Sequence, residues 1–161
     1  MRHWRLVLGL LIAACLLTGL ASAQAPDEKQ MNAYIDAMKK DLRTQKQSLV
    51  DQAMGLEAAQ KSQFWSIYEG YQTALNAIWD QRIANIKKYA ANYDKMTDAV
   101  ADQLATAALD LEGQRSALRK KYYATYKEKM GARVAARFLQ TEATLGYLMD
   151  LKISSEIPIL Q

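Results

Sequence analysis

The strongest periodic pattern of the chain lies between Glu57 and Tyr93, in the segment EAAQKSQFWSIYEGYQTALNAIWDQRIANIKKYAANY. Large side chains recur along it at alternating spacings of four and three residues: Phe64, Tyr68, Tyr71, Leu75, Ile78, Arg82, Ile86, Tyr89 and Tyr93. A repeat of this period, sustained over so many turns, is typical of a long helix that packs against a partner helix as in a coiled coil. The pattern predicts a helix from about Glu57 to Ala91, with Trp65 and Trp79 beside its seam.

A second long helix is predicted from about Asp98 to Lys129, where the same spacing continues. Its large and apolar residues are Val100, Leu104, Ala107, Leu111, Leu118, Tyr122 and Tyr126. The segment Asn92–Met96 carries turn-forming side chains, and Thr97 is a candidate N-cap for the helix that follows. Two long helices joined by so short a turn predict an antiparallel hairpin.

Two shorter helices are predicted to flank this hairpin. The first runs from about Glu28 to Ala53, and its apolar stripe consists of Met31, Ile35, Met38, Leu42 and Leu49, with basic residues on the outer face. The last spans about Ala132 to Ser154, after a break at Gly131, with Val134, Phe138, Leu145, Leu148 and Met149 on one face. No alternating strand pattern is present. The predicted fold is all-α: a long antiparallel helical hairpin covered by two further helices.

Two glycines and the C-terminal tail leave alternatives open. Gly70 and Gly113 fall inside predicted helices, where glycine costs about 1 kcal/mol relative to alanine. We expect both to be simply tolerated, with a bend or a close helix contact as the alternative. The segment Ile157–Leu160 follows the last helix and is expected either to dock on the bundle or to form a short exposed contact.

Residues 1–23 have the three parts of a signal peptide. Arg2 and Arg5 precede an apolar run, and Ala21-Ser22-Ala23 supplies small residues for cleavage before Gln24. We therefore expect a periplasmic protein whose residues 24–161 form a single all-helical domain. An uncleaved membrane anchor, or lipoprotein processing at Cys15, is the alternative.

The composition after the leader excludes much familiar chemistry. The only histidine and the only cysteine of the chain, His3 and Cys15, lie in the predicted signal peptide. Nucleophilic catalysis with an imidazole base and most transition-metal sites need these side chains. Removal of Arg2 and Arg5 lowers the formal net charge from +4 to +2, which argues against a nucleic-acid partner. We expect no enzyme activity, no cofactor and no metal site.

Carboxylates alone leave one enzymatic alternative open. Two suitably spaced acids are sufficient for acid–base hydrolysis, as in glycosidases. The acids of this chain are, however, expected on the solvated polar faces of the helices, which disfavours a hydrolase.

The rings and cations along the helices indicate a surface for other polypeptides. Aromatic side chains combined with basic ones are common where a protein binds a polypeptide, although at this spacing most rings belong to the core. The candidate polypeptide-binding residues are Lys39, Lys40, Arg43, Lys46, Trp65 and Trp79.

Short segments at two helix starts carry a family resemblance. Leu56-Glu57-Ala58-Ala59-Gln60 and Met96-Thr97-Asp98-Ala99-Val100 resemble the Leu-Thr-x-x-Gln hallmark of the Spy/CpxP-like periplasmic proteins. The segments Gln60–Tyr71 and Ala135–Glu142 are similar to a group of uncharacterised secreted helical proteins of proteobacteria. The resemblance implies an ATP-independent chaperone or envelope-stress role, often performed by a cradle-shaped dimer.

Together these features predict a non-enzymatic periplasmic helical protein that binds unfolded or envelope proteins. The expected partners include a second copy of the chain and exclude nucleic acid, and no stable membrane insertion is expected after cleavage. The alternative is an envelope structural or adaptor protein that docks one specific partner.

Overall fold

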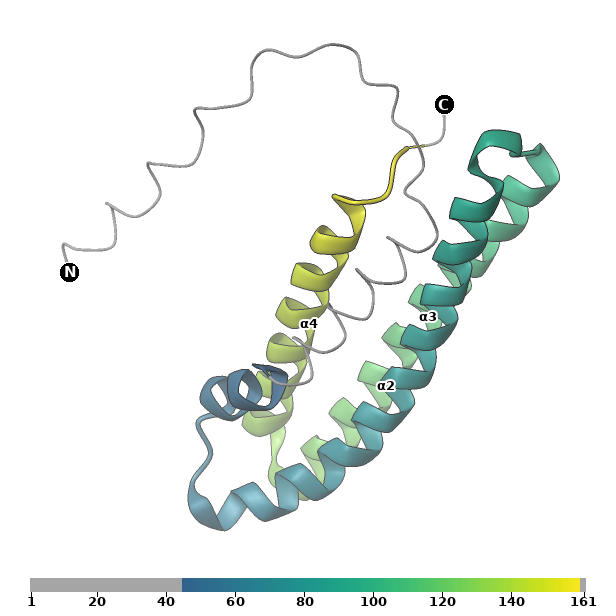
Figure 1. Cartoon of the computed structure of the whole chain (residues 1–161). Helices are drawn as coiled ribbons and strands as arrows, with labels where there is room; N and C mark the ends of the chain where they lie inside the picture. Colours follow the sequence, from purple (N-terminus) through teal and green to yellow (C-terminus); the bar gives the residue numbers. More distant parts are fainter. Residues whose placement is uncertain (1–44, 160–161) are drawn as a thin grey trace, which may run out of the picture.

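The structure, a computed structural model, describes residues 45–159, and within them it contains helices and no strand (Figure 1). Residues 45–54 are helical and are followed by α2 (Ala58–Asn92), α3 (Asp98–Met130) and α4 (Ala132–Ser154). A short 3-10 helix, η1 (Tyr93–Lys95), joins α2 to α3. The all-α prediction is confirmed. The predicted signal peptide and the beginning of the predicted first helix lie outside the described residues.

The helices α2 and α3 lie side by side and antiparallel, as predicted for the hairpin (Figure 1). Their ends fall within one residue of the predicted ones, and the bounds of α4 coincide with the prediction. The Thr97 hydroxyl accepts a hydrogen bond of 3.3 Å from the Val100 amide, which caps α3 as expected. Gly131 separates α3 from α4 and has a φ of +89°, a backbone conformation that residues other than glycine rarely adopt.

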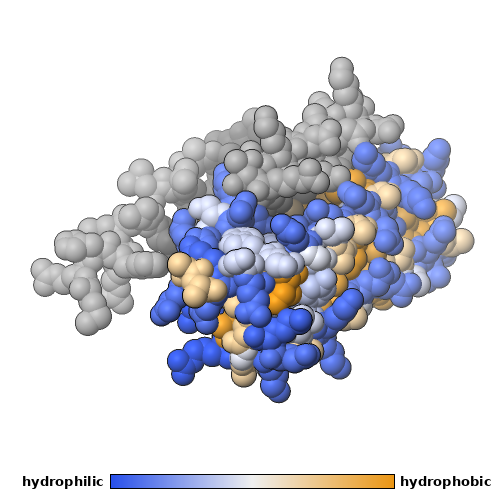
Figure 2. Space-filling model, turned by 90° about the horizontal axis from the view of Figure 1, so that it is seen from below, coloured by the Kyte–Doolittle hydropathy of each residue, from blue (hydrophilic) through white to orange (hydrophobic). Residues whose placement is uncertain are grey.

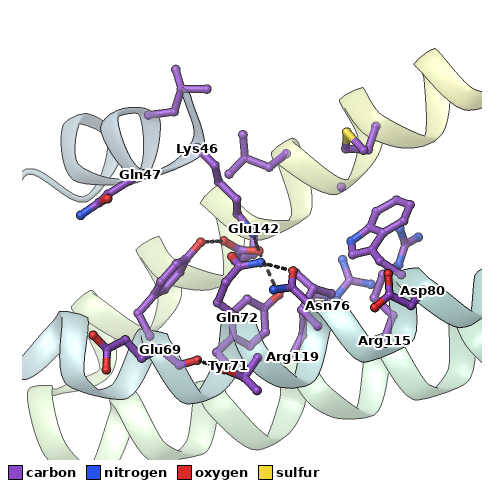
Figure 3. Close-up of a pocket in the computed structure, with 18 of the residues that line it drawn as sticks. Lys46, Gln47, Glu69, Tyr71, Gln72, Asn76, Asp80, Arg115, Arg119 and Glu142 are labelled. Carbon is purple, nitrogen blue, oxygen red and sulfur yellow. Dashed lines mark hydrogen bonds and ion pairs between the residues drawn. The ribbon is translucent and has the colours of Figure 1, made fainter. Parts of the chain in front are cut away.

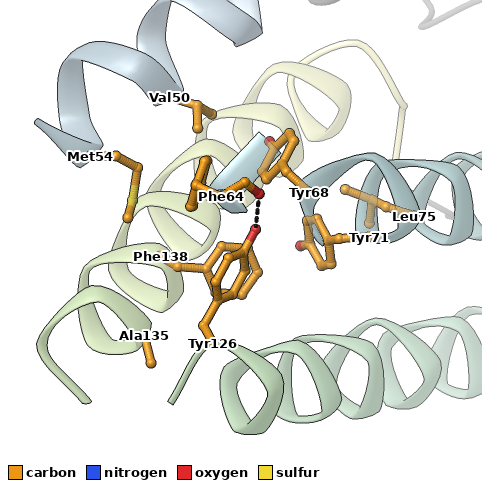
Figure 4. Packing of buried hydrophobic residues seen from close by; sticks show 9 residues of the cluster. All are labelled: Val50, Met54, Phe64, Tyr68, Tyr71, Leu75, Tyr126, Ala135 and Phe138. Carbon is orange, nitrogen blue, oxygen red and sulfur yellow. Dashed lines mark hydrogen bonds between the residues drawn. The ribbon is translucent and has the colours of Figure 1, made fainter. Parts of the chain in front are cut away.

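The core lies at the end of the hairpin where α3 meets α4. Its buried members come from all four helices: Val50, Met54, Phe64, Tyr68, Tyr71, Leu75, Tyr126, Ala135 and Phe138 (Figure 4). Phe64 and Tyr126 stack with ring centroids 5.1 Å apart, and Tyr126 contacts Phe138 at 4.5 Å. The Tyr126 hydroxyl donates to the Phe64 carbonyl, so the one polar tip in this stack is satisfied (Figure 4).

The hairpin is packed less tightly toward η1. The seam residues of α2 from Ile78 to Tyr93 are only half-buried, and the separate buried contact there consists of Ile83 against Ile86. Figure 2, which views the molecule from the opposite end, shows apolar side chains in several places among mostly hydrophilic ones. The predicted seam is therefore a fully buried core over its first half only.

The inward faces of two helices differ from the prediction. Leu49 is 44% exposed, and the buried residues of its helix are Val50 and Met54 instead. Lys46 lies one turn before Val50 and points inward, so its predicted place on the outer face is wrong. On α4, Leu148 is 59% exposed and Glu142 is buried, which also contradicts the expectation that all acids are solvated. Both helices are rotated so that Lys46 meets Glu142.

Gly70 permits a close approach of α3 to α2. A Cβ atom at this position would lie 2.8 Å from the Tyr122 hydroxyl oxygen, which is closer than real contacts allow. A Cβ at Gly113 would meet nothing within 4 Å. Simple tolerance is therefore right for Gly113 and wrong for Gly70, where the alternative of close helix contact holds.

The C-terminal tail docks on the far end of α2. The Tyr89 hydroxyl donates a hydrogen bond of 2.7 Å to the Pro158 carbonyl, and the Tyr93 hydroxyl donates one of 3.1 Å to the Ile159 carbonyl. Ile157 and Pro158 are half-buried, whereas the Ile159 side chain is exposed. The docked alternative for this segment is therefore the observed one.

Candidate functional site

A cavity of about 620 Å³ opens between the first helix, α2, α3 and α4 (Figure 3). Its volume lies in the range of small-molecule sites. The wall from α2 carries Trp65, Tyr68, Glu69, Tyr71, Gln72, Thr73, Leu75, Asn76, Trp79, Asp80 and Ile83. The other helices contribute Lys46, Gln47, Leu49, Arg115, Arg119, Glu142, Leu145, Gly146 and Met149. Rings, apolar side chains and charges of both signs thus meet in one place.

A buried carboxylate, Glu142 of α4, forms the polar centre of this cavity. It accepts hydrogen bonds from the hydroxyl of Tyr68 at 2.6 Å and that of Tyr71 at 2.9 Å. The Lys46 ammonium donates a third at 3.2 Å (Figure 3). The tyrosines lie one turn apart on α2, so one helix face presents both hydroxyls. The first helix, α2 and α4 are therefore joined through a single side chain.

Burial around Glu142 changes the proton affinity of its partners. Burial is the main cause that raises the pKa of Tyr68 and Tyr71, and the charge of Glu142 raises both further. Tyr126 shows the same direction for the same two causes. Burial lowers the pKa of Lys46, although Glu142 acts in the opposite direction. These directions predict a loss of stability in alkali.

We expect the free energy of unfolding to fall as the pH rises above ~10. Below that pH the three buried tyrosines are protonated in both states, so their contribution is fully present. Above it the unfolded state releases their protons while the folded state retains them, which favours unfolding. The lowered pKa of Lys46 has the opposite effect, because the unfolded state then binds more protons at pH values up to the ordinary lysine pKa of 10.5. This single group is outweighed by the three tyrosines.

Urea unfolding at a series of pH values, with tyrosinate absorbance as a second readout, measures this effect. The Tyr147→Phe variant, which removes an exposed tyrosine, should leave the alkaline loss unchanged. Stability that stays constant well above pH ~10 would show that the buried hydroxyls ionise as freely as those in the unfolded chain.

A second ionic cluster includes Arg115, which lines the cavity. Asp150 of α4 accepts hydrogen bonds of 3.0 and 2.8 Å from Arg115 of α3 and a further one from Arg82 of α2. Burial acts to raise the pKa of Asp150, but the hydrogen bonds from the two arginines outweigh it and hold this pKa below its ordinary value. The Arg82 guanidinium also lies 5.0 Å from the Trp79 ring centroid, a cation–π distance.

The structure brings together three of the residues that the sequence suggested. Lys46, Trp65 and Trp79 all line the cavity, and Trp65 packs edge-on against Tyr68 at 5.2 Å. Lys39, Lys40 and Arg43 lie outside the described residues. Lys46 lines the cavity as the ion-pair partner of Glu142 and does not lie on a basic outer face of its helix.

Sequence reasoning missed the residues that organise the cavity: Glu142, Asp150, Arg115 and Arg119. A usable indication existed for Glu142, because it falls between Phe138 and Leu145 at the spacing of the inward face of α4. An acid at such a position implies a buried partner. The identity of that partner depends on which helices pack against α4. The spacing of residues along α4 does not reveal this.

The outward face of α4 is a second candidate surface. It carries Tyr147, Leu148 and Leu151, which are 67%, 59% and 70% exposed. The other exposed positions on this side include Gln140, Thr144, Ser155 and one basic residue, Lys152, which lies one turn after Leu148. Since the opposite side of α4 faces the core, this helix is apolar on both sides.

No protein-family model, curated protein or solved structure matches this chain. The fold defines an all-α helical protein that has a cavity with a buried carboxylate at its centre and exposed apolar side chains on the outer face of α4. Among the described helices, none has a stretch both long enough and apolar enough to span a membrane. No three acidic side chains within residues 45–159 lie close enough together to hold a metal ion.

Proposed function

We propose that the chain is a non-enzymatic periplasmic protein that binds other polypeptides, in the manner of an ATP-independent chaperone or envelope-stress protein. The observation that carries the proposal is the group of exposed apolar side chains on the outer face of α4, formed by Tyr147, Leu148 and Leu151. A helix that is apolar on both sides is normally covered on both sides. A contiguous exposed apolar patch of this kind marks an interaction surface.

The spacing of this face suits a polypeptide partner. Tyr147 and Leu151 lie one helical turn apart, and Leu148 adjoins both, which is the arrangement of anchors used when amphipathic segments pack on a helix. The three anchors are themselves uncharged, so their contacts do not require one partner sequence, and clients of different sequence can be accepted. The Spy/CpxP-like resemblance implies the same class of activity, and the leader supports the periplasmic location.

The polar centre of the cavity supports a role without catalysis. Glu142 accepts from three donors, and Asp150 is held by two arginines, so neither carboxylate is available as a general acid or base in this arrangement. Acid–base hydrolysis needs a pair of carboxylates that can reach the substrate.

An envelope adaptor that docks one specific partner is the second candidate. It is favoured by the confinement of the outer apolar face to a single helix, because a small surface of fixed shape fits one partner segment. Affinity capture from envelope extracts separates the two: one stoichiometric partner favours the adaptor, and many weakly bound clients favour the chaperone.

The proposal predicts that Leu148→Gln combined with Leu151→Gln removes client protection. The purified chain from Gln24 should slow the aggregation of an unfolding client without nucleotide. The double variant should need about tenfold more protein for the same effect, because buried apolar anchors each contribute on the order of 1 kcal/mol or more. Its stability should change by less than ~0.5 kcal/mol per site, as both side chains are exposed.

Leu109→Gln is the matched control. Leu109 of α3 is 69% exposed, almost the same as Leu151, but lies outside the α4 face. If Leu109→Gln weakens protection as much as the double variant does, or if the wild-type chain gives no protection at several-fold molar excess, the proposed function is wrong.

A further inference from the structure

Within residues 45–159, one guanidinium that lines the cavity has no ion-pair or hydrogen-bond partner. Lys46 is paired with Glu142, and Arg82 and Arg115 share Asp150. Arg119 of α3 also lines the cavity, is half-buried, and makes no ion pair or hydrogen bond with the described residues. It lies near Tyr71, whose hydroxyl is already bound to Glu142 (Figure 3). Half-buried guanidinium groups normally have an acceptor, and the part of the chain that the structure describes provides none for Arg119.

The charges around the cavity floor favour an anion. The lining has three cationic side chains, Lys46, Arg115 and Arg119; the first is paired with the buried Glu142, and the second with Asp150, which lies outside the lining. The remaining acids of the lining, Glu69 and Asp80, are exposed on α2 and therefore screened by water. The buried part of the site thus has an excess of positive charge. This charge is on Arg119, which lines the cavity.

The rest of the wall near these cations is apolar. Leu75, Trp79 and Ile83 of α2 face Leu145 and Met149 of α4 across the cavity, and Gly146 leaves the α4 wall without a side chain. Sites of this size that combine an apolar lining with one placed charge usually bind a small ligand whose polar end is fixed by that charge.

We propose that this cavity binds a small amphipathic carboxylate, whose anionic group pairs with Arg119 and whose apolar tail packs against Trp79, Leu145 and Met149. The planar guanidinium matches a carboxylate through two parallel hydrogen bonds. A singly charged group suits Arg119, the cation of the lining that is left without a counter-charge among residues 45–159. This site lies on the inner side of α4, so its occupancy is independent of the polypeptide surface proposed above.

The test is a titration of the chain from Gln24 with octanoate, followed by intrinsic fluorescence. After removal of the leader with Trp4, the only tryptophans are Trp65 and Trp79, and both line the cavity. We expect a saturable change in emission, and the Trp79→Phe variant should lose most of it. Octanol, which has the same tail without the charge, should bind about tenfold or more weakly, the difference expected for a charged hydrogen-bonded pair.

Arg119→Gln should weaken octanoate binding by about tenfold to a hundredfold and leave octanol binding unchanged. Lys120→Gln is the matched control, because it removes the same charge from the adjacent, exposed position of α3. Gly146→Leu, which fills the cavity from α4, should abolish binding of both compounds. Thermal unfolding of each variant shows whether it is folded.

Three results would overturn this inference. One is equal affinity for octanoate and octanol. Another is an Arg119→Gln variant that is folded and binds octanoate as the wild type does. The third is the absence of any fluorescence or thermal response to octanoate, which would mean that another part of the chain fills the cavity in solution. Response only to a peptide with a free C-terminal carboxylate would assign the site to polypeptides instead.

Discussion

Replacing Glu142 by alanine is expected to lower the free energy of unfolding by about 3–5 kcal/mol. The side chain is only 4% exposed, and it accepts hydrogen bonds from Lys46, Tyr68 and Tyr71. Its removal leaves a half-buried ammonium without its counter-charge and two buried hydroxyls without an acceptor. Breaking a buried pair by deleting one partner is costly because the remaining charge is uncompensated. Urea unfolding followed by circular dichroism measures the loss.

Two further variants separate charge from packing. Glu142→Gln retains an acceptor for one hydroxyl and should lose less stability than Glu142→Ala. The double variant Lys46→Met with Glu142→Leu removes both charges and should be more stable than the sum of the single effects implies, because buried pairs are often replaceable by apolar residues. Glu128→Ala, at an exposed position of α3, controls for the loss of one acidic side chain.

A change of less than ~0.5 kcal/mol for Glu142→Ala, equal to that of Glu128→Ala, would contradict the structure at this point. Such a result would mean that Glu142 is solvated and that the first helix and α4 do not meet through Lys46.

Replacing Phe138 by alanine is expected to cost a similar 3–5 kcal/mol. Phe138 is 1% exposed and contacts two rings, Tyr71 of α2 at 5.0 Å and Tyr126 of α3 at 4.5 Å. It is therefore the α4 ring that ties this helix to both arms of the hairpin. Truncation removes its apolar contacts and leaves a cavity that the surrounding rigid rings cannot fill.

Tyr147→Ala is the control, because it removes an aromatic side chain from the same helix at a position that is 67% exposed. It should change the stability by less than ~0.5 kcal/mol. Thermal and urea unfolding of both variants give the comparison. Equal losses at Phe138 and Tyr147 would show that the inner and outer faces of α4 are assigned the wrong way round.

The bounds of the helices could be predicted because their causes are local. The alternation of large side chains from Phe64 onward fixes the period of α2, and the Thr97 hydroxyl starts α3 by accepting from an amide three residues later. Gly131 ends α3 with a backbone conformation that depends on the absence of its own side chain. None of these effects needs a distant part of the chain.

The rotation of the helices could not be predicted in the same way. Leu148 and Leu145 both extend the apolar pattern of α4, but only one of them can face the hairpin when Glu142 points to Tyr68 and Tyr71. Likewise, Leu49 and Val50 compete for the inner face of the first helix, and the pairing of Lys46 with Glu142 favours Val50. A buried ion pair between residues 96 positions apart leaves no trace in local spacing.

Most residues of the candidate site, like the rotation of the helices, could not be predicted from local sequence. Trp65 and Trp79 were accessible to sequence reasoning because aromatic side chains beside a seam are conspicuous. Arg119 is one of many basic residues in the second half of α3, and only the ion pairs of its neighbours distinguish it. Its lack of a partner among the described residues depends on how all four helices pack together.

The class of fold, the ends of the helices in residues 57–154 and the hairpin follow from local sequence, because helix period, capping and turn residues act over a few positions. The inward faces of the helices, the partners of Glu142 and the position of the cavity emerge only when the helices pack together. Those outcomes depend on buried charges finding partners and on side chains from different helices filling one volume. Such requirements link residues that are distant along the chain.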